Sequence, residues 1–148
     1  MSSAVRKNNY SSQLAPREEF TANLENGSTF KALYTVLEES TTPGRGDVYM
    51  VIAYDRQNTY ARTFTIVFKK STLEGRISIT DDDLDSNVIF NNYEDPENPT
   101  LQKATGGILS YKLDIAENQF SGSFTADVTK ADGSGTFPCT ANFDTWLS

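Results

Sequence analysis

Apolar residues occupy every second position through long stretches of this chain, and this two-residue period determines the fold class that it can adopt. In the last third, apolar positions alternate at residues 109–115, 120–128 and 137–143, with turn-forming residues at 116–118 and at Asp132-Gly133. Successive side chains of a strand point to opposite faces of a sheet, so each stretch predicts a strand with one buried face. No stretch of ten or more residues shows the period of an amphipathic helix. We therefore predict an all-β protein.

Two more alternating stretches, at residues 20–24 and 30–36, flank the dipeptide Asn26-Gly27. Asn-Gly in this position is the strongest local signal for a hairpin, because both residues accept the positive φ of a type I′ turn. We predict a type I′ hairpin here, with the alternating apolar residues of both strands on one face.

The middle of the chain is less regular. Residues 47–54 carry apolar side chains on both faces, which predicts a central strand. Further strands are predicted at 60–70, 76–80 and 88–90, whereas residues 93–103 contain two prolines and are predicted to be irregular.

Glycine and proline give three more local predictions. Gly106-Gly107 and residues 133–135 are predicted to be turns, since no helix that could make them phosphate-binding loops follows. Pro138 has no N–H for a second neighbouring strand, so strand 137–143 is predicted to lie at a sheet edge.

These elements amount to about eight or nine strands, which we assign to a single β domain at residues 18–148, preceded by a flexible polar arm at residues 1–17. We favour an antiparallel β-sandwich of jelly-roll or Greek-key type, because the strand at 47–54 has two apolar faces. A closed meander β-barrel is the alternative, because consecutive hairpins are typical of that architecture.

No histidine occurs in the 148 residues, and this absence narrows the chemistry available to the protein. Imidazole is the usual general base and the commonest transition-metal ligand, so Ser-His-Asp, Cys-His and His-containing zinc sites are excluded. The single cysteine, Cys139, cannot build a thiolate zinc cluster alone, and it alternates with Phe137 and Ala141, which predicts a small buried side chain. We predict no cofactor.

The net charge is −7, and residues 71–148 hold thirteen acidic and four basic side chains. Such a field repels phosphate backbones, so nucleic acid is not a predicted partner. The longest apolar run, Val48 to Tyr54, is far shorter than the ~20 residues of a membrane-spanning helix, so no integral membrane segment is predicted. The first residues show no secretory pattern; we expect a cytoplasmic protein, or an exported one if a signal segment has been removed.

Tyrosine and arginine side chains on predicted strands are the candidate ligand-binding residues. A concave sheet lined by such side chains would suit a sugar or another amphipathic ligand. The set that we assign to this role is Tyr49, Tyr54, Arg56, Tyr60 and Arg62.

The densest acidic cluster, residues 81–87, is the candidate metal site. Hard cations such as Ca²⁺ take carboxylate and amide oxygens, and Asp81, Asp83, Asp85 and Asn87 offer them. The spacing departs from the helix-loop-helix calcium loop at Val88, where that loop requires glycine. We therefore favour a solvated acidic loop over a calcium site.

The tripeptide Arg45, Gly46 and Asp47 resembles the Arg-Gly-Asp motif of integrin ligands, which would imply a receptor as partner. The preceding Pro43-Gly44 makes an ordinary turn before a strand the favoured interpretation.

The acidic loops and the tyrosine and arginine residues on predicted strands suit recognition better than catalysis. We predict a non-enzymatic binding or interaction module that recognises a protein or a small ligand through loops or an aromatic-lined concave sheet. Three alternatives remain open: a carboxylate-type enzyme acting on carbohydrate, a barrel that binds an apolar ligand, and an oligomeric structural subunit. The acids considered for the enzyme are Glu74, Glu94, Asp114 and Glu117.

Overall fold

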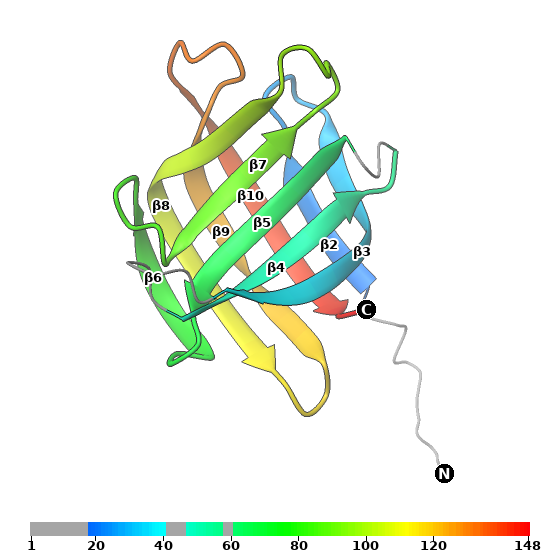
Figure 1. Ribbon diagram of the computed structural model, residues 1–148, viewed down its shortest axis with the longest axis vertical. Coiled ribbons are helices and arrows are strands. Elements are labelled where there is room, and N and C mark those ends of the chain that lie inside the picture. The colour runs from blue at the N-terminus through cyan, green and yellow to red at the C-terminus, as the bar shows by residue number, and fades with distance from the viewer. Residues whose placement is uncertain (1–17, 41–46, 58–60) are drawn as a thin grey trace.

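The computed structural model describes residues 18–40, 47–57 and 61–148, and all regular secondary structure in these residues is β-strand. The strands labelled in Figure 1 are β2 (Glu18–Asn23), β3 (Thr29–Ser40), β4 (Val48–Asp55), β5 (Arg62–Lys69), β6 (Glu74–Thr80), β7 (Asn87–Asn92), β8 (Thr100–Asp114), β9 (Gln119–Thr129) and β10 (Thr136–Trp146). The predicted all-β class is confirmed. The predicted arm at 1–17 lies outside the described residues, and no helix within them is long and apolar enough to cross a membrane.

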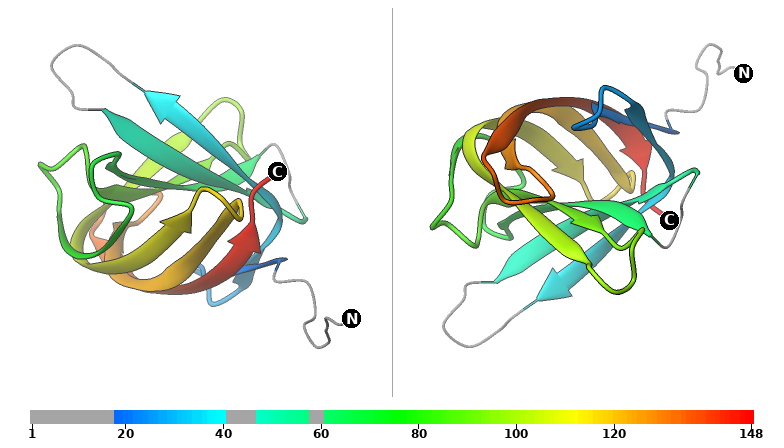
Figure 2. Two further views of the ribbon diagram at one scale, coloured as in Figure 1. Left: turned by 90° about the horizontal axis from the view of Figure 1, so that it is seen from below. Right: turned by 90° about the horizontal axis from the view of Figure 1, so that it is seen from above.

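The strands close into an antiparallel barrel. Around the ring the order is β2-β3-β4-β5-β7-β8-β9-β10, and β10 pairs back with β2. Figure 2 shows these strands surrounding one interior, with β6 added outside the ring on the second half of β8. The closed meander barrel that was the alternative is therefore the architecture, and the sandwich that we favoured is wrong.

The sandwich prediction rested on the strand with apolar residues on both faces, which is β4. β4 is central as predicted, between β3 and β5, but its outer side chains do not pack against a second sheet. Met50, Ile52 and Tyr54 point outward and are only half-buried, whereas Val51 and Ala53 on the inner face are fully buried.

Two glycines allow the barrel strands to bend and to approach closely. β8 pairs with β7 through residues 100–103 and with β6 through residues 106–112, and its register against β9 shifts between Ala104 and Gly106. Gly107 has a φ of 127°, and a Cβ there would stand 2.2 Å from the carbonyl oxygen of Thr125. In β9, a Cβ at Gly122 would stand 2.0 Å from the carbonyl oxygen of Ser110. The predicted turn at Gly106-Gly107 is thus wrong, because the pair lies inside the longest strand, and residues 100–103 of the segment predicted to be irregular belong to β8.

Aromatic rings fill the barrel interior. Phe68 stacks near Phe120 at 5.6 Å between ring centroids, Phe120 on Phe143 at 4.9 Å, and Phe143 on Phe20 at 5.3 Å. The contacts continue through Phe30 and Phe64, 4.9 Å apart, to Phe90, which lies 4.8 Å from Phe64. We call these seven phenylalanines the aromatic column; it runs through the core, and all seven side chains are buried. The alternation of apolar residues in the sequence predicted a buried position for most of them.

A bulge in β3 changes which residues face inward. The register between β3 and β4 shifts between Ala32 and Tyr34, so Leu33 is an extra, half-exposed residue. Phe30 and Ala32 are buried as predicted, but Tyr34 lies on the outer face, where its ring stacks on Tyr54 at 4.7 Å. An inserted residue reverses the inward and outward alternation beyond it, which the sequence pattern did not reveal.

Pro138 does not lie in an edge strand, because β10 pairs with β9 on one side and with β2 on the other. The pairing with β2 covers residues 141–145 only, and β2 ends at Asn23. Thr140 donates its N–H to the side chain of Asn23, and amides two residues apart in a strand point the same way. The missing N–H of Pro138 therefore faces the side where β2 has already ended.

The first hairpin forms where predicted but with a different turn. Gly27 has a φ of 85°, whereas Asn26 is not among the described residues with positive φ, so the turn is not type I′. The N–H of Gly27 bonds to the carbonyl of Leu24, and the N–H of Leu24 to the carbonyl of Ser28, which closes a loop over residues 25–27. A turn followed by a left-handed glycine is the common three-residue hairpin connection.

Replacement of Gly107 by alanine should destabilise the barrel far more than the same change at its neighbour. In G107A the added Cβ meets backbone atoms of β9, whereas in G106A the nearest atom is a side-chain oxygen of Asp127 at 3.7 Å. We expect urea unfolding to show a loss of at least about 3 kcal/mol for G107A and a change within about 1 kcal/mol for G106A. Equal losses would contradict the role assigned to the bend.

Candidate functional site

The barrel opens into a pocket at one end, beneath the β2–β3, β7–β8 and β9–β10 loops at the top of Figure 1. We call it the mouth pocket; its volume is about 350 Å³. Its buried lining comes from barrel strands and the first loop, and its more exposed rim from the three loops and the end of β7. The lining consists of Leu24, Arg62, Phe90 and Gln102 in the buried part, and Glu25, Asn26, Asn92, Glu94 and Ala131 at the rim.

A buried ion pair forms one wall of the barrel at this end. Asp55 continues the inward positions of β4 after Val51 and Ala53, and Arg62 begins the inward positions of β5 before Phe64. Asp55 Oδ2 accepts a hydrogen bond from Arg62 Nε at 2.6 Å and is also paired with Nη2. The side chains are 2% and 11% exposed, so each charge depends on the other for compensation.

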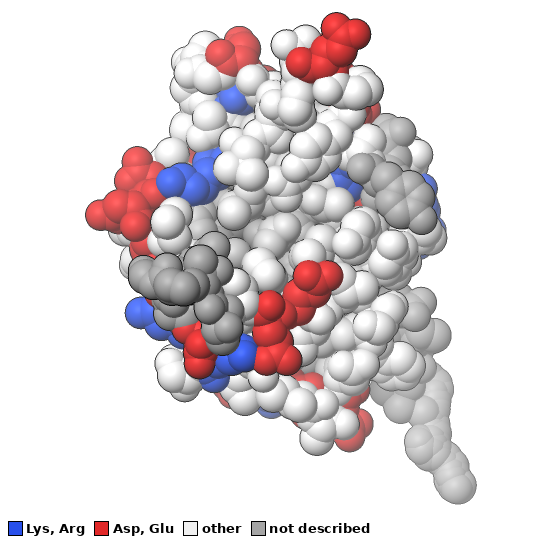
Figure 3. Space-filling model, in the orientation of Figure 1, with Lys and Arg blue, Asp and Glu red and all other residues white. Residues whose placement is uncertain are grey.

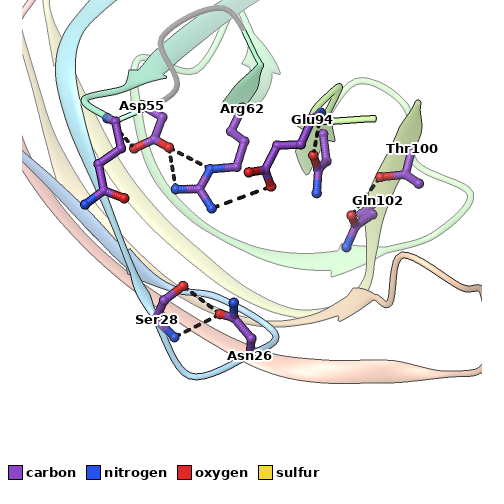
Figure 4. A network of polar contacts seen from close by, with 9 residues as sticks. Asn26, Ser28, Asp55, Arg62, Glu94, Thr100 and Gln102 are labelled. Atoms are coloured by element: carbon purple, nitrogen blue, oxygen red, sulfur yellow. Dashed lines mark hydrogen bonds and ion pairs between the residues drawn. The ribbon is translucent and has the colours of Figure 1, made fainter. Parts of the chain in front are cut away.

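The remaining guanidinium nitrogen of Arg62, Nη1, has no hydrogen bond to any residue that the structure describes. Glu94 Oε1 lies 3.8 Å from Nη1, within ion-pair range but too far for a hydrogen bond, and the Glu94 side chain is 44% exposed (Figure 4). Arg62 is therefore held firmly by Asp55 on one side and loosely by Glu94 at the rim.

The side-chain amides of the mouth pocket have their oxygens engaged. Asn26 Oδ1 accepts from the N–H and hydroxyl of Ser28, and Asn92 Oδ1 accepts from the N–H of Glu94 at 3.0 Å. Gln102 is 2% exposed and is held at both ends of its amide, since Oε1 accepts from Thr100 Oγ1 and Nε2 donates one N–H to the carbonyl of Thr129, each at 2.8 Å.

Two loops of the rim are joined by Glu25. Its Oε1 accepts the backbone N–H of Ala131 at 3.0 Å, which connects the β2–β3 loop to the β9–β10 loop across the mouth. This contact uses the backbone of Ala131, so the side chain at this position can vary without removing it.

The predicted ligand residues do not converge on one site. Tyr60 lies outside the described residues, and of the other four only Arg62 lines the mouth pocket. Tyr49 packs against Phe68 with Lys70 Nζ 5.4 Å from its ring centre, Tyr54 stacks on the outer face, and Arg56 is exposed.

The acidic loop at 81–87 is organised by its own hydrogen bonds. Asn87 is 1% exposed, and its Nδ2 donates to the carbonyls of Thr80 and Asp83, while Asp83 Oδ1 accepts the N–H of Asp85. Lys103 Nζ donates to the backbone carbonyl of Asp81. Within the described part of the chain, no three acidic or cysteine side chains gather as metal ligands do. The solvated acidic loop that we favoured over a calcium site stays a prediction.

The receptor motif falls mostly outside the described residues. Arg45 and Gly46 are not described, and Asp47 is exposed beside Lys69, Lys70 and Asp85 in a surface hollow.

Cys139 is fully buried on the inner face of β10, and its Sγ donates to the carbonyl of Asn23 at 3.2 Å. Burial raises the pKa of its thiol to about 12. The thiolate is the reactive form, so this cysteine is inert in the folded protein.

The acids considered for carboxylate catalysis are spread over the surface. Glu94 lines the mouth pocket, Glu74 and Asp114 line two different outer hollows, and Glu117 is exposed in the β8–β9 turn. They share no cleft.

Sequence reasoning missed Asp55 and Gln102, although each carried a signal. Asp55 follows Val51 and Ala53 at the two-residue spacing of one strand face, so the alternation already indicated a charged side chain on the inner face. Gln102 lies in phase with Ala104, but the prolines before it favoured an irregular segment. The loop residues Asn26 and Glu94 carried no comparable signal.

Comparisons with known proteins add no relative: no family model, no curated protein and no solved structure matches this chain.

Removing either member of the buried ion pair should cost more than removing both together. R62M leaves the Asp55 carboxylate buried without its partner, and D55L leaves Arg62 with Glu94 alone. We expect about 3–5 kcal/mol of destabilisation for each single variant by urea unfolding. In D55L/R62M the loss should be smaller than that of either single variant, because neither charge is then left buried without its partner; additive losses would show that the two side chains are not coupled.

Cys139 should resist thiol reagents until the protein unfolds. At mildly alkaline pH, we expect the native chain to react with a disulfide reagent at least about 100-fold more slowly than the chain in urea, because burial disfavours the thiolate. Reaction of the native chain at the unfolded rate would contradict the observed burial.

Proposed function

We propose that this protein is a non-enzymatic binding protein that takes a small amphipathic ligand into the mouth pocket. Of the functions considered from the sequence, this one combines the binding module with the barrel alternative. The observation that carries it is Arg62, a charged side chain at an inward barrel position whose guanidinium lines a pocket of about 350 Å³.

The composition of the pocket supports this proposal. Ligand sites are typically concave and mainly apolar, with a few placed polar groups, and volumes begin at roughly 300 Å³. Phe90 and Leu24 supply apolar surface, Arg62 and Asn92 supply polar groups, and the mouths of β-barrels are a common place for such sites.

The rigidity of the surrounding barrel is a second support. The aromatic column ends at Phe90, so the pocket borders a packed interior, and Gln102 is fixed within β8 and to β9 through its bonds to Thr100 and Thr129. A preorganised site loses less entropy when a ligand binds.

A fluorescent neutral probe, N-phenyl-1-naphthylamine, tests the proposal. We expect its emission to rise on binding to the protein, and A131W, which places an indole at the rim, to weaken binding at least about 10-fold. The matched control S134W adds the same group to the same loop at an exposed position that does not line the pocket. Absence of binding, or equal effects of the two variants, would overturn the proposal.

A further inference from the structure

We propose that the mouth pocket selects uncharged ligands that present a hydrogen-bond acceptor, such as an amide, ester or ketone, on a small apolar body. This inference rests on the proposed function and specifies its ligand class. Two features carry it: Arg62 and the two asparagine amides of the pocket offer donors, and the charge around the pocket disfavours a free anion.

The available donors follow from the hydrogen bonds already made. Arg62 Nε and Nη2 are committed to Asp55, whereas among the described residues Nη1 has only Glu94, at 3.8 Å. Asn26 and Asn92 use their oxygens internally, and within the described residues their Nδ2 groups form no hydrogen bond. Because backbone N–H groups bond to these oxygens, the orientation of both amides is fixed by chemistry.

Of these three donors, Arg62 Nη1 should contribute most to binding, because the Arg62 side chain is the most buried. The side chain is 11% exposed, so water reaches it poorly, and an unpaired buried donor loses its hydration without compensation. A ligand carbonyl at Nη1 would supply the missing acceptor. Hydrogen bonds to charged groups contribute more than neutral ones do, so the guanidinium discriminates strongly for an acceptor.

The charges around the pocket argue against a carboxylate ligand. The positive charge of Arg62 is already matched by Asp55, and the rim adds Glu25 and Glu94. Figure 3 shows further acidic atoms on the loops at the upper end, where Asp95 and Asp132 are exposed. Hydrogen bonds from Asn98 and Ser134 lower the pKa of these two carboxyls, so both are ionised at neutral pH.

A cationic ligand meets the opposite difficulty. The acidic rim attracts a cation, but an ammonium group offers no hydrogen-bond acceptor to Arg62 Nη1 or to the Asn92 amide. In the buried part of the pocket, its positive charge would face the positive guanidinium of Arg62. Figure 4 shows Asn26 on the β2–β3 loop opposite Arg62, Glu94 and Gln102, so donors lie on both sides of the entrance. A neutral acceptor is the ligand chemistry that uses these groups without a charge penalty.

Four ligands of one shape separate the alternatives: phenylacetamide, phenylacetate, phenethylamine and propylbenzene. Each is titrated at neutral pH against the bound naphthylamine probe. We expect phenylacetamide to displace the probe at a concentration at least about 10-fold below the other three, because it alone pairs with Nη1 without adding charge.

The variant E94Q provides the matched test of the charge argument. It keeps the size of the side chain and removes the carboxylate nearest to Nη1. We expect the preference for phenylacetamide over phenylacetate to fall about 10-fold in E94Q. An unchanged preference would overturn the charge argument.

The remaining outcomes are distinct. Stronger displacement of the probe by phenylacetate would show that the ligand displaces Glu94. Stronger displacement by phenethylamine would show that the acidic rim determines binding, and equal displacement by propylbenzene would show that Arg62 does not contact the ligand. Each of these results overturns this inference and leaves the proposed function standing. If the probe binds and none of the four displaces it, the inference also fails. If the probe itself does not bind, the proposed function fails first.

Discussion

Closure of the sheet, where β10 pairs back with β2, is the constraint on which the rest of this structure depends. A closed ring has no edges within it, and it gives every strand one face toward a common interior. To close, the strands must coil and bend, which requires backbone conformations that side chains would obstruct at Gly107 and Gly122. The same closure fixes a narrow interior that side chains must fill.

Large flat aromatic rings are the bulkiest side chains that fill the interior. The aromatic column extends from Phe68 to Phe90, and stacked and edge-on contacts at 4.8–6.0 Å link its members. Rings of this kind bury much apolar area with few rotatable bonds, which favours a single packed arrangement. The last ring of the column, Phe90, also lines the mouth pocket, so the pocket begins where the column ends.

Polar groups enter the interior at this same end. Asp55, Arg62 and Gln102 occupy inward positions at the ends of their strands next to the mouth, where each finds a partner within the ring or a loop. A buried ion pair is costly to desolvate and is weak evidence for a role in stability alone. Its occurrence beside a pocket, with one guanidinium nitrogen left for a ligand, is what links the fold to the proposed binding function.

The sequence by itself determined the all-β class, most strand positions and the buried faces of the last three strands, because a two-residue alternation is a local property of the chain. It also placed Arg62 among the candidate residues. Only the tertiary structure decided between sandwich and barrel, moved Tyr34 to the outside through the bulge at Leu33, and gave Pro138 a position inside a paired strand. It alone joined Asp55, Arg62 and Glu94 with the Asn26 loop, since these residues meet only when the ring closes. Alternation specifies which way a side chain points, but the partner it meets depends on pairings between strands distant in the sequence.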